Sequence, residues 1–148
     1  MQKAIAIILA SIFLFGCIQT PQEQHSAKIT FEGSSLSINA KIADTPHARS
    51  KGLMHMDFMP QNQGMLFVYS KEQSLSFWMA NTRIPLDIIF LAKDKTIVDI
   101  QKMQPCIRTD PKGCKTYLSK EKAMYALEIN QNLSAKYNLK PGQKASWN

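Results

Sequence analysis

The feature that most restricts the fold of this 148-residue chain is an apolar run near its middle. Ile88, Ile89, Phe90 and Leu91 follow one another without a polar residue between them. An apolar strand without alternation is typical of a central strand that is covered on both faces. The chain must therefore place a layer on each side of this segment, as two sheets packed face to face or as one sheet that partly closes into a barrel.

Alternation of apolar and polar residues predicts further strands. From Leu36 to Ile42 the apolar residues occupy every second position, which is the period of a sheet with one solvated face. Ile29 and Phe31 predict a short partner strand before a turn at Gly33 and Ser34. Lys93 to Lys95 is a tight polar connection that favours a hairpin. The remaining expected strands cover residues 65–69, 75–79, 86–92, 96–103 and 124–130, with a last strand that contains Trp147.

Two short helices interrupt this pattern. Thr45 supplies a capping hydroxyl before Pro46, a residue that suits the first helical position, and the helix is expected to run to about Gly52. A second helix is expected from Leu133 to Asn138, where Pro141 and Gly142 follow. The chain is therefore predicted to be mostly β, with one or two short helices.

The N-terminus has the layout of a secretory signal. Lys3 precedes an uncharged, mostly apolar run over residues 4–15, which is too short for a membrane span of about 20 residues. The next motif, Leu14 to Cys17, resembles the lipobox of bacterial lipoproteins, in which the cysteine is acylated, although Phe15 is bulkier than the residue usual there. An ordinary cleaved signal and an uncleaved anchor are the alternatives.

This resemblance implies a division of the chain and an address. Residues 1–16 form the signal, 17–27 a tether that begins at the acylated Cys17, and 28–148 a single domain of a size that one core can support. The partner is then a membrane, reached through the lipid and facing the periplasm. Ile18 after the cysteine favours the outer membrane if the host is Gram-negative. The formal net charge of +7 is spread along the chain, and nucleic acid is not an expected partner outside the cytoplasm.

The cysteines agree with an exported protein. If Cys17 carries lipid, Cys106 and Cys114 remain as an even pair in an oxidising compartment. They bracket a turn-rich stretch, so a disulfide is the favoured interpretation, worth about 2.5 kcal/mol in the chain-entropy model. A redox pair or half of a metal site is the alternative, but the spacing is not C-x-x-C and no second cysteine pair exists for structural zinc.

Several central motifs together resemble the domain of unknown function 192 family over about residues 28–147. They are Gly52–Met54, Gly64–Val68, Phe77–Thr82, Ile84–Leu91 and Leu127–Asn130. The resemblance implies a small β-sandwich of jelly-roll type, and it carries no settled activity. Met56 stands where the family usually has arginine, Ala80 where lysine is common, and Asn130–Asn132 lacks the usual glycine. If those charges bind an anion in relatives, this chain has altered that ability.

The sequence contains no recognisable catalytic constellation: no zinc-peptidase helix, nucleophile elbow, phosphate loop or dinucleotide fingerprint. No cofactor is expected. Asp87 and Glu128 lie in strand segments and could meet as the carboxylate pair of an envelope hydrolase. The alternative is that each accepts hydrogen bonds from backbone or asparagine donors at a strand end.

Trp78 is the main candidate for ligand binding. The apolar positions Leu75, Phe77 and Met79 assign Trp78 to the opposite face of its strand, near Asn81 and Thr82. A tryptophan among amides and hydroxyls can stack on a sugar or a similar small molecule. The alternative is a buried polar knot of Asn81, Thr82 and Asp87 that fixes the turn before the central strand.

A third hypothesis concerns soft metals. Met54, His55, Met56 and Met59 offer thioether and imidazole ligands that suit Cu(I), although methionine also fills gaps in cores. The sequence as a whole favours a lipid-anchored binding or interaction module of the cell envelope, with the hydrolase and the copper protein as alternatives.

Overall fold

The computed structural model describes residues 25–108 and 110–147. Nine strands form two sheets, with two short helices, so the expected mostly β class is confirmed. The elements are β1 (Ser26–Phe31), β2 (Ser37–Ala43), α1 (Pro46–Lys51), β3 (Gln63–Gln73), β4 (Ser76–Trp78), β5 (Leu86–Leu91), β6 (Ile97–Met103), a 3-10 turn (Pro111–Gly113), β7 (Thr116–Leu118), β8 (Ala123–Asn130), α2 (Leu133–Lys136) and β9 (Ala145–Ser146). Residues 1–16 and Cys17, the expected signal and lipidation site, lie outside the described residues.

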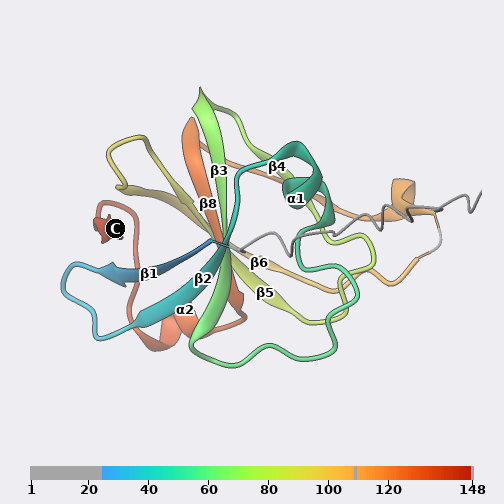
Figure 1. The fold of residues 1–148 in the computed structure, drawn as a ribbon, viewed down its shortest axis with the longest axis horizontal. Helices are drawn as coiled ribbons and strands as arrows, with labels where there is room; N and C mark the ends of the chain where they lie inside the picture. Colours follow the sequence, from blue (N-terminus) through green and yellow to red (C-terminus); the bar gives the residue numbers. More distant parts are fainter. Residues whose placement is uncertain (1–24, 109, 148) are drawn as a thin grey trace, which may run out of the picture.

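Seven strands form one strongly curled sheet in the order β6-β5-β8-β3-β2-β1-β9 (Figure 1). Its two edges approach each other: the Ile97 N–H donates to the Gln143 carbonyl at 2.8 Å, and the Ala145 N–H donates to the Lys95 carbonyl at 3.0 Å. Of the two expected architectures, the partly closed barrel is therefore the one present.

The expected strands are present with shifted ends. β1 pairs with β2 through Thr30 and Ser37 on either side of the turn at Gly33. β1 begins at Ser26, inside the expected tether, because Ala27 is buried and pairs with Ala40. All six residues of β5 are buried, which confirms the central strand covered on both faces. The strand β7 was not expected, since Tyr117 is its only buried residue and three residues carry too little pattern.

Two apolar clusters cover the two faces of the curled sheet. The cluster that the curl encloses, here the inner core, joins residues from both edges of the sheet, such as Ile97 and Ala145, to Ile89 and Leu127. The second cluster, the outer core, packs Ile88 and Phe90 of β5 against β4, β7 and the segment around α1. The candidate site described below lies on this outer side.

α1 follows β2 and confirms the expected capping. The Thr45 hydroxyl accepts a hydrogen bond from the Ala48 N–H at 3.1 Å, and Pro46 occupies the first turn. Gly52 ends the helix with a φ of +47°, a conformation that strains any residue with a side chain. The chain therefore turns back toward the sheet immediately after α1, beside the ring of Phe67.

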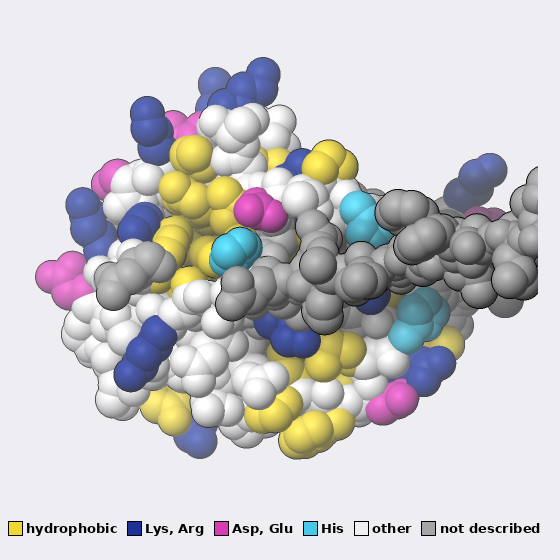
Figure 2. Space-filling view, viewed as in Figure 1, with side chains coloured by type: hydrophobic (Ala, Val, Ile, Leu, Met, Phe, Trp, Pro, Cys, Tyr) yellow, Lys and Arg dark blue, Asp and Glu magenta, His cyan; other side chains and the backbone are white. Residues whose placement is uncertain are grey.

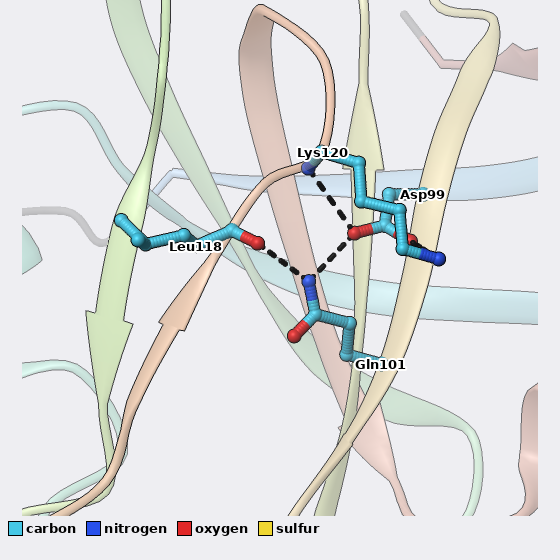
Figure 3. Close-up of polar contacts among 4 residues, drawn as sticks. All are labelled: Asp99, Gln101, Leu118 and Lys120. Atoms are coloured by element: carbon cyan, nitrogen blue, oxygen red, sulfur yellow. Dashed lines mark hydrogen bonds and ion pairs between the residues drawn. The ribbon is translucent and has the colours of Figure 1, made fainter.

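A polar cluster attaches β4 and β7 to the edge of the curled sheet (Figure 3). The Gln101 side-chain amide of β6 donates at 2.6 Å both to the Asp99 carboxylate and to the Leu118 carbonyl of β7. The Lys120 N–H also donates to Asp99 at 3.3 Å, and the Lys120 ammonium lies 3.4 Å from it. Asp99 is buried, so these contacts are what compensate its charge and fix the small sheet.

The disulfide between Cys106 and Cys114 is present, with 5.9 Å between the two Cα atoms. It closes the loop between β6 and β7. Cys106 also connects this loop to the turn after β4, because its carbonyl accepts from the Asn81 N–H at 3.0 Å and its N–H donates to the Thr82 carbonyl at 3.3 Å.

Among the described residues, no helix has the length and apolar character needed to cross a membrane.

Candidate functional site

The candidate site centres on Glu128, whose side chain is on the outer face of the curled sheet. Glu128 of β8 lies directly between Met65 of β3 and Ile88 of β5, and all three face the outer core. β3 and β8 approach closely here: a Cβ added to Gly64 would lie 2.5 Å from the Glu128 carbonyl oxygen. Glycine at position 64 is therefore a steric requirement of this pair of strands.

A small recess opens beside the Glu128 side chain. Its volume is about 30 Å³, which is room for about one or two water molecules. Its walls come from Glu128 and Phe67 of the sheet, Trp78 and Thr82 of the β4 region, and the residues from Arg49 to Met54 at the end of α1. The recess can therefore take one small polar group of a ligand, and the remainder of that ligand must lie outside it.

Glu128 is an unusual carboxyl group. The residue is only 4% exposed, its side chain lines the recess, and no hydrogen bond to its carboxyl group is found within residues 25–108 and 110–147. Burial raises its pKa from 4.5 to about 8. At pH 7 the group is therefore mostly protonated, and its hydroxyl can donate a hydrogen bond to whatever enters the recess.

Arg49 and Tyr69 flank this carboxyl group. Arg49 donates to the Val68 carbonyl at 3.0 Å, and its guanidinium lies 4.9 Å from the centre of the Tyr69 ring. Burial raises the pKa of Tyr69, the Arg49 charge opposes that change, and Glu128 adds to it. Neither residue is among the expected site residues, because nothing in the sequence indicates that α1 packs against the end of β3.

Trp78 is half-exposed, at 47%, while its neighbour Phe77 is buried in the outer core. This confirms that the two side chains point to opposite faces of β4. Phe77 packs edge-on against the rings of Phe67 and Phe90, which fixes the strand on which Trp78 stands. The indole thus forms part of the recess and also presents surface to solvent.

Asn81 and Thr82 form the turn that follows β4. Asn81 has a φ of +55°, and its carbonyl accepts from the His55 N–H at 2.9 Å. Thr82 is buried, and its hydroxyl donates to the Ala80 carbonyl at 3.4 Å. Among the described residues, the hydrogen bonds of this turn go to backbone groups, so the expected knot that includes Asp87 is not formed. Thr82 reaches the recess, whereas Asn81 is not among the lining residues.

The hypothesis that Asp87 and Glu128 meet as a carboxylate pair is wrong. Ile88 is the residue opposite Glu128 on β5, so Asp87 points to the other face of the sheet. There the Asp87 carboxylate accepts from the N–H of Ser134 at 3.1 Å and from the Ser134 hydroxyl. These bonds hold α2 against the sheet. The alternative interpretation, in which the carboxylate accepts a hydrogen bond from a backbone donor, therefore describes Asp87. A two-carboxylate hydrolase site is therefore absent from these two residues.

The expected soft-metal residues separate into two groups. A groove of about 860 Å³ adjoins the recess on the other side of the Gly52 turn, and Met54, His55 and Met56 line it. Met59 does not: it is 3% exposed and packs in the outer core. The groove is also lined by three residues that lie outside this motif in the sequence, His25, His47 and Met65. Only the fold brings these residues together.

Comparisons with known proteins agree with this architecture. The model of the DUF192 family, described as Uncharacterized ACR, matches residues 27–147. A crystal structure from Sinorhizobium meliloti 1021, of a protein described as a candidate transcription regulator, is similar with a TM-score of 0.74 and 26% identity over 84% of this chain and 95% of that one.

A second similar crystal structure is that of a protein of unknown function from Novosphingobium aromaticivorans DSM 12444. Its TM-score is 0.71 and its identity 30%, over 82% of this chain and 84% of that one. No curated protein matches the chain. Because the family model extends over nearly the whole described domain, the chain belongs to the DUF192 family.

Proposed function

We propose that this protein is a binding module of the cell envelope for an uncharged polar ligand whose ring has an apolar face, such as a sugar. In this proposal the ring stacks on Trp78, and one of its hydroxyl or carbonyl groups enters the recess and pairs with Glu128. The observation that carries the proposal is the buried carboxyl group of Glu128, which burial keeps mostly protonated at pH 7 and which lines an open recess.

Burial of the Glu128 carboxyl group disfavours its charged form, and this desolvation cost is what raises its pKa. A ligand hydroxyl that accepts from the protonated Glu128 offsets this cost, so binding gains from a group that folding has already desolvated. Because the pKa of Glu128 is about 8, the carboxyl group is mostly neutral at pH 7 and donates a hydrogen bond to the ligand.

The shape of the site supports a ring that remains largely outside. The recess holds one small group only, and the half-exposed Trp78 beside it offers an aromatic surface. Aromatic side chains with solvated faces commonly contribute to recognition of amphipathic ligands. Lys51 and Arg49 also line the recess, and the Arg49 guanidinium is already engaged by the Val68 carbonyl.

Tryptophan fluorescence tests this proposal. In a Trp147→Phe background the emission reports Trp78 alone, and we expect neutral monosaccharides and disaccharides, including N-acetylglucosamine, to change it in a saturable way. Glu128→Leu is expected to weaken binding at least tenfold, because it removes the donor. Glu128→Gln keeps an amide donor of similar shape and is expected to retain most of the affinity.

The controls separate binding from folding. Trp78→Phe keeps an aromatic ring and should bind more weakly than the parent but measurably, while Trp78→Ala should lose binding with an unchanged circular dichroism spectrum. Saturable binding that is the same with Trp78→Ala, measured by calorimetry, would place the ligand elsewhere. No saturable change with any neutral sugar would reject the sugar class.

A further inference from the structure

We propose that the groove on the other side of the Gly52 turn is a site for a soft monovalent cation, Cu(I), held by the thioethers of Met54, Met56 and Met65 and by an imidazole of His47 or His55. This site is independent of the recess at Glu128. The starting observation is the lining of the groove, which gathers sulfur and imidazole groups from separate elements. They are His25, His47, Met54, His55, Met56 and Met65.

Met54 and Met56 differ in exposure from the methionines that only fill the core. Met59, Met79 and Met103 are almost wholly buried, as gap-filling methionines usually are. Met54 and Met56 are only half-buried and line an open groove, with the buried Met65 of β3 beneath. Met56 and Met65 also pack against the outer core, so their thioethers would bind a soft metal from the side that faces the groove.

The segment that carries two of these sulfurs is held in place by its backbone. The Met54 N–H donates to the Lys51 carbonyl at 3.2 Å, the His55 N–H to the Asn81 carbonyl at 2.9 Å, and the Met56 N–H to the Leu53 carbonyl at 3.4 Å. His55 has a φ of +64°, so the chain turns sharply between the two methionines. Fixed backbone positions for neighbouring ligands reduce the entropy that metal binding would otherwise cost.

Charge and ligand type select the metal. Within the described residues, no three side chains of His, Cys, Asp or Glu gather closely enough to hold a metal ion, which argues against zinc and other ions that need such a set. The groove is lined by Lys41, Lys51 and a single acid, Asp44, so a divalent cation is repelled more than a monovalent one. Thioether and imidazole groups are the neutral ligands that Cu(I) prefers.

Histidine side chains appear on the same face of the molecule as hydrophobic groups in Figure 2, apart from one another. Because the imidazoles lie apart, at most one of them is assigned to the site. His25 lies at the start of β1, where its carbonyl accepts from the Ile42 N–H at 2.9 Å, and it is not assigned as a ligand.

Methionine methyl NMR with silver as the probe tests the site. Ag(I) is a diamagnetic analogue of Cu(I) with the same preference for thioethers. The sample is the full chain with Cys17→Ala, so that this sulfur does not contribute, purified under oxidising conditions in chloride-free buffer. One equivalent of Ag(I) is expected to shift the methyl resonances of Met54, Met56 and Met65, and to leave those of Met59, Met79 and Met103 unchanged.

Variants give the second measurement. Met54→Leu with Met56→Leu conserves volume and should weaken Ag(I) binding at least tenfold, and anaerobic Cu(I) binding likewise. Met124→Leu, a half-buried position of β8 that does not line the groove, is the matched control and should change neither. His47→Gln or His55→Gln should weaken binding as well, which identifies the imidazole.

Three results would overturn the inference. They are resonances that do not shift at one equivalent, shifts confined to methionines outside the groove, and a double variant that binds Ag(I) as tightly as the parent while its spectrum shows an intact fold. If neither histidine substitution weakens binding, the assigned ligand set is wrong. Competition by equimolar Zn(II) would also contradict the preference for a soft ion.

Discussion

At the scale of single residues, Glu128 is the least expected feature of the domain. The sequence predicted that Glu128 lies in a strand, but it did not predict that Glu128 is separated from the other strand carboxylate, Asp87. Whether a carboxylate meets a partner depends on which face of the sheet it shares with others, and here Asp87 is on the opposite face because β5 and β8 align Ile88 with Glu128. A shift of one residue in that register would have reversed the outcome.

The buried Glu128 makes stability depend on pH in a defined window. Its pKa is about 8 in the folded protein and about 4.5 in the unfolded chain, so the unfolded chain releases the proton first as pH rises. The contribution of Glu128 to the free energy of unfolding is fully present below about pH 4.5 and is lost progressively between about pH 4.5 and 8. Above about pH 8 it does not change further. Over the window the parent loses roughly 5 kcal/mol relative to Glu128→Gln, at about 1.4 kcal/mol per pH unit.

Chemical denaturation of the parent and of Glu128→Gln at pH 5, 6.5 and 8 measures this difference. The two free energies of unfolding should be closest at pH 5, and Glu128→Gln should become the more stable protein at pH 8. Glu72→Gln, a change at an exposed residue, is the control and should follow the parent. Parallel pH profiles for the parent and Glu128→Gln would show that Glu128 ionises normally in the folded protein.

At the scale of elements, the sequence predicted what depends on local pattern. The alternation over 36–42, the unbroken apolar run of β5 and the Thr45–Pro46 cap each led to the element that is present. The strand β7 and the packing of Arg49 on Tyr69 could not be predicted, since both arise from contacts between segments far apart in the chain. The groove that joins His25 to Met65 is of the same kind.

The disulfide acts on the site through the turn after β4. Cys106 bonds through its backbone to both Asn81 and Thr82, and Thr82 lines the recess. We expect Cys106→Ala with Cys114→Ala to lower the free energy of unfolding by about 2.5 kcal/mol and also to change the emission of Trp78. The measurement is urea denaturation of the double variant in the Trp147→Phe background.

The single substitution Cys114→Ser separates the two effects. It removes the covalent link and keeps the Cys106 side chain, which packs against the outer core, so it should lose the same stability if the bond alone is responsible. A double variant with unchanged stability would mean that the loop between β6 and β7 is equally restricted without the bond. Unchanged Trp78 emission would mean that the turn is fixed by the small sheet alone.

At the scale of the whole molecule, the fold class was accessible from sequence and the function was not. Lys and Arg side chains are scattered over the surface in view and do not form one block, so net charge identifies no partner (Figure 2). The proposed address depends on residues 14–17, and the proposed ligand on a recess that forms only when α1, β4 and β8 come together.

The address itself can be measured directly. If Cys17 is acylated, mass spectrometry of the protein from membranes should find a mature chain that begins at Cys17 and carries lipid. Globomycin, which blocks lipoprotein signal cleavage, should cause the precursor to accumulate, and Cys17→Ala should release the protein from the membrane fraction. An unmodified Cys17 in a soluble mature protein would contradict the anchor without changing the fold.

The seam of the barrel has a consequence for biogenesis. Residues 142–145 join the edge at 95–97, and β9 pairs with β1, so the segment that closes the sheet is translated after all the other described strands. The inner core cannot be sealed while that segment is still inside the ribosome. The domain therefore completes its folding only after the segment up to residue 146 has left the ribosome.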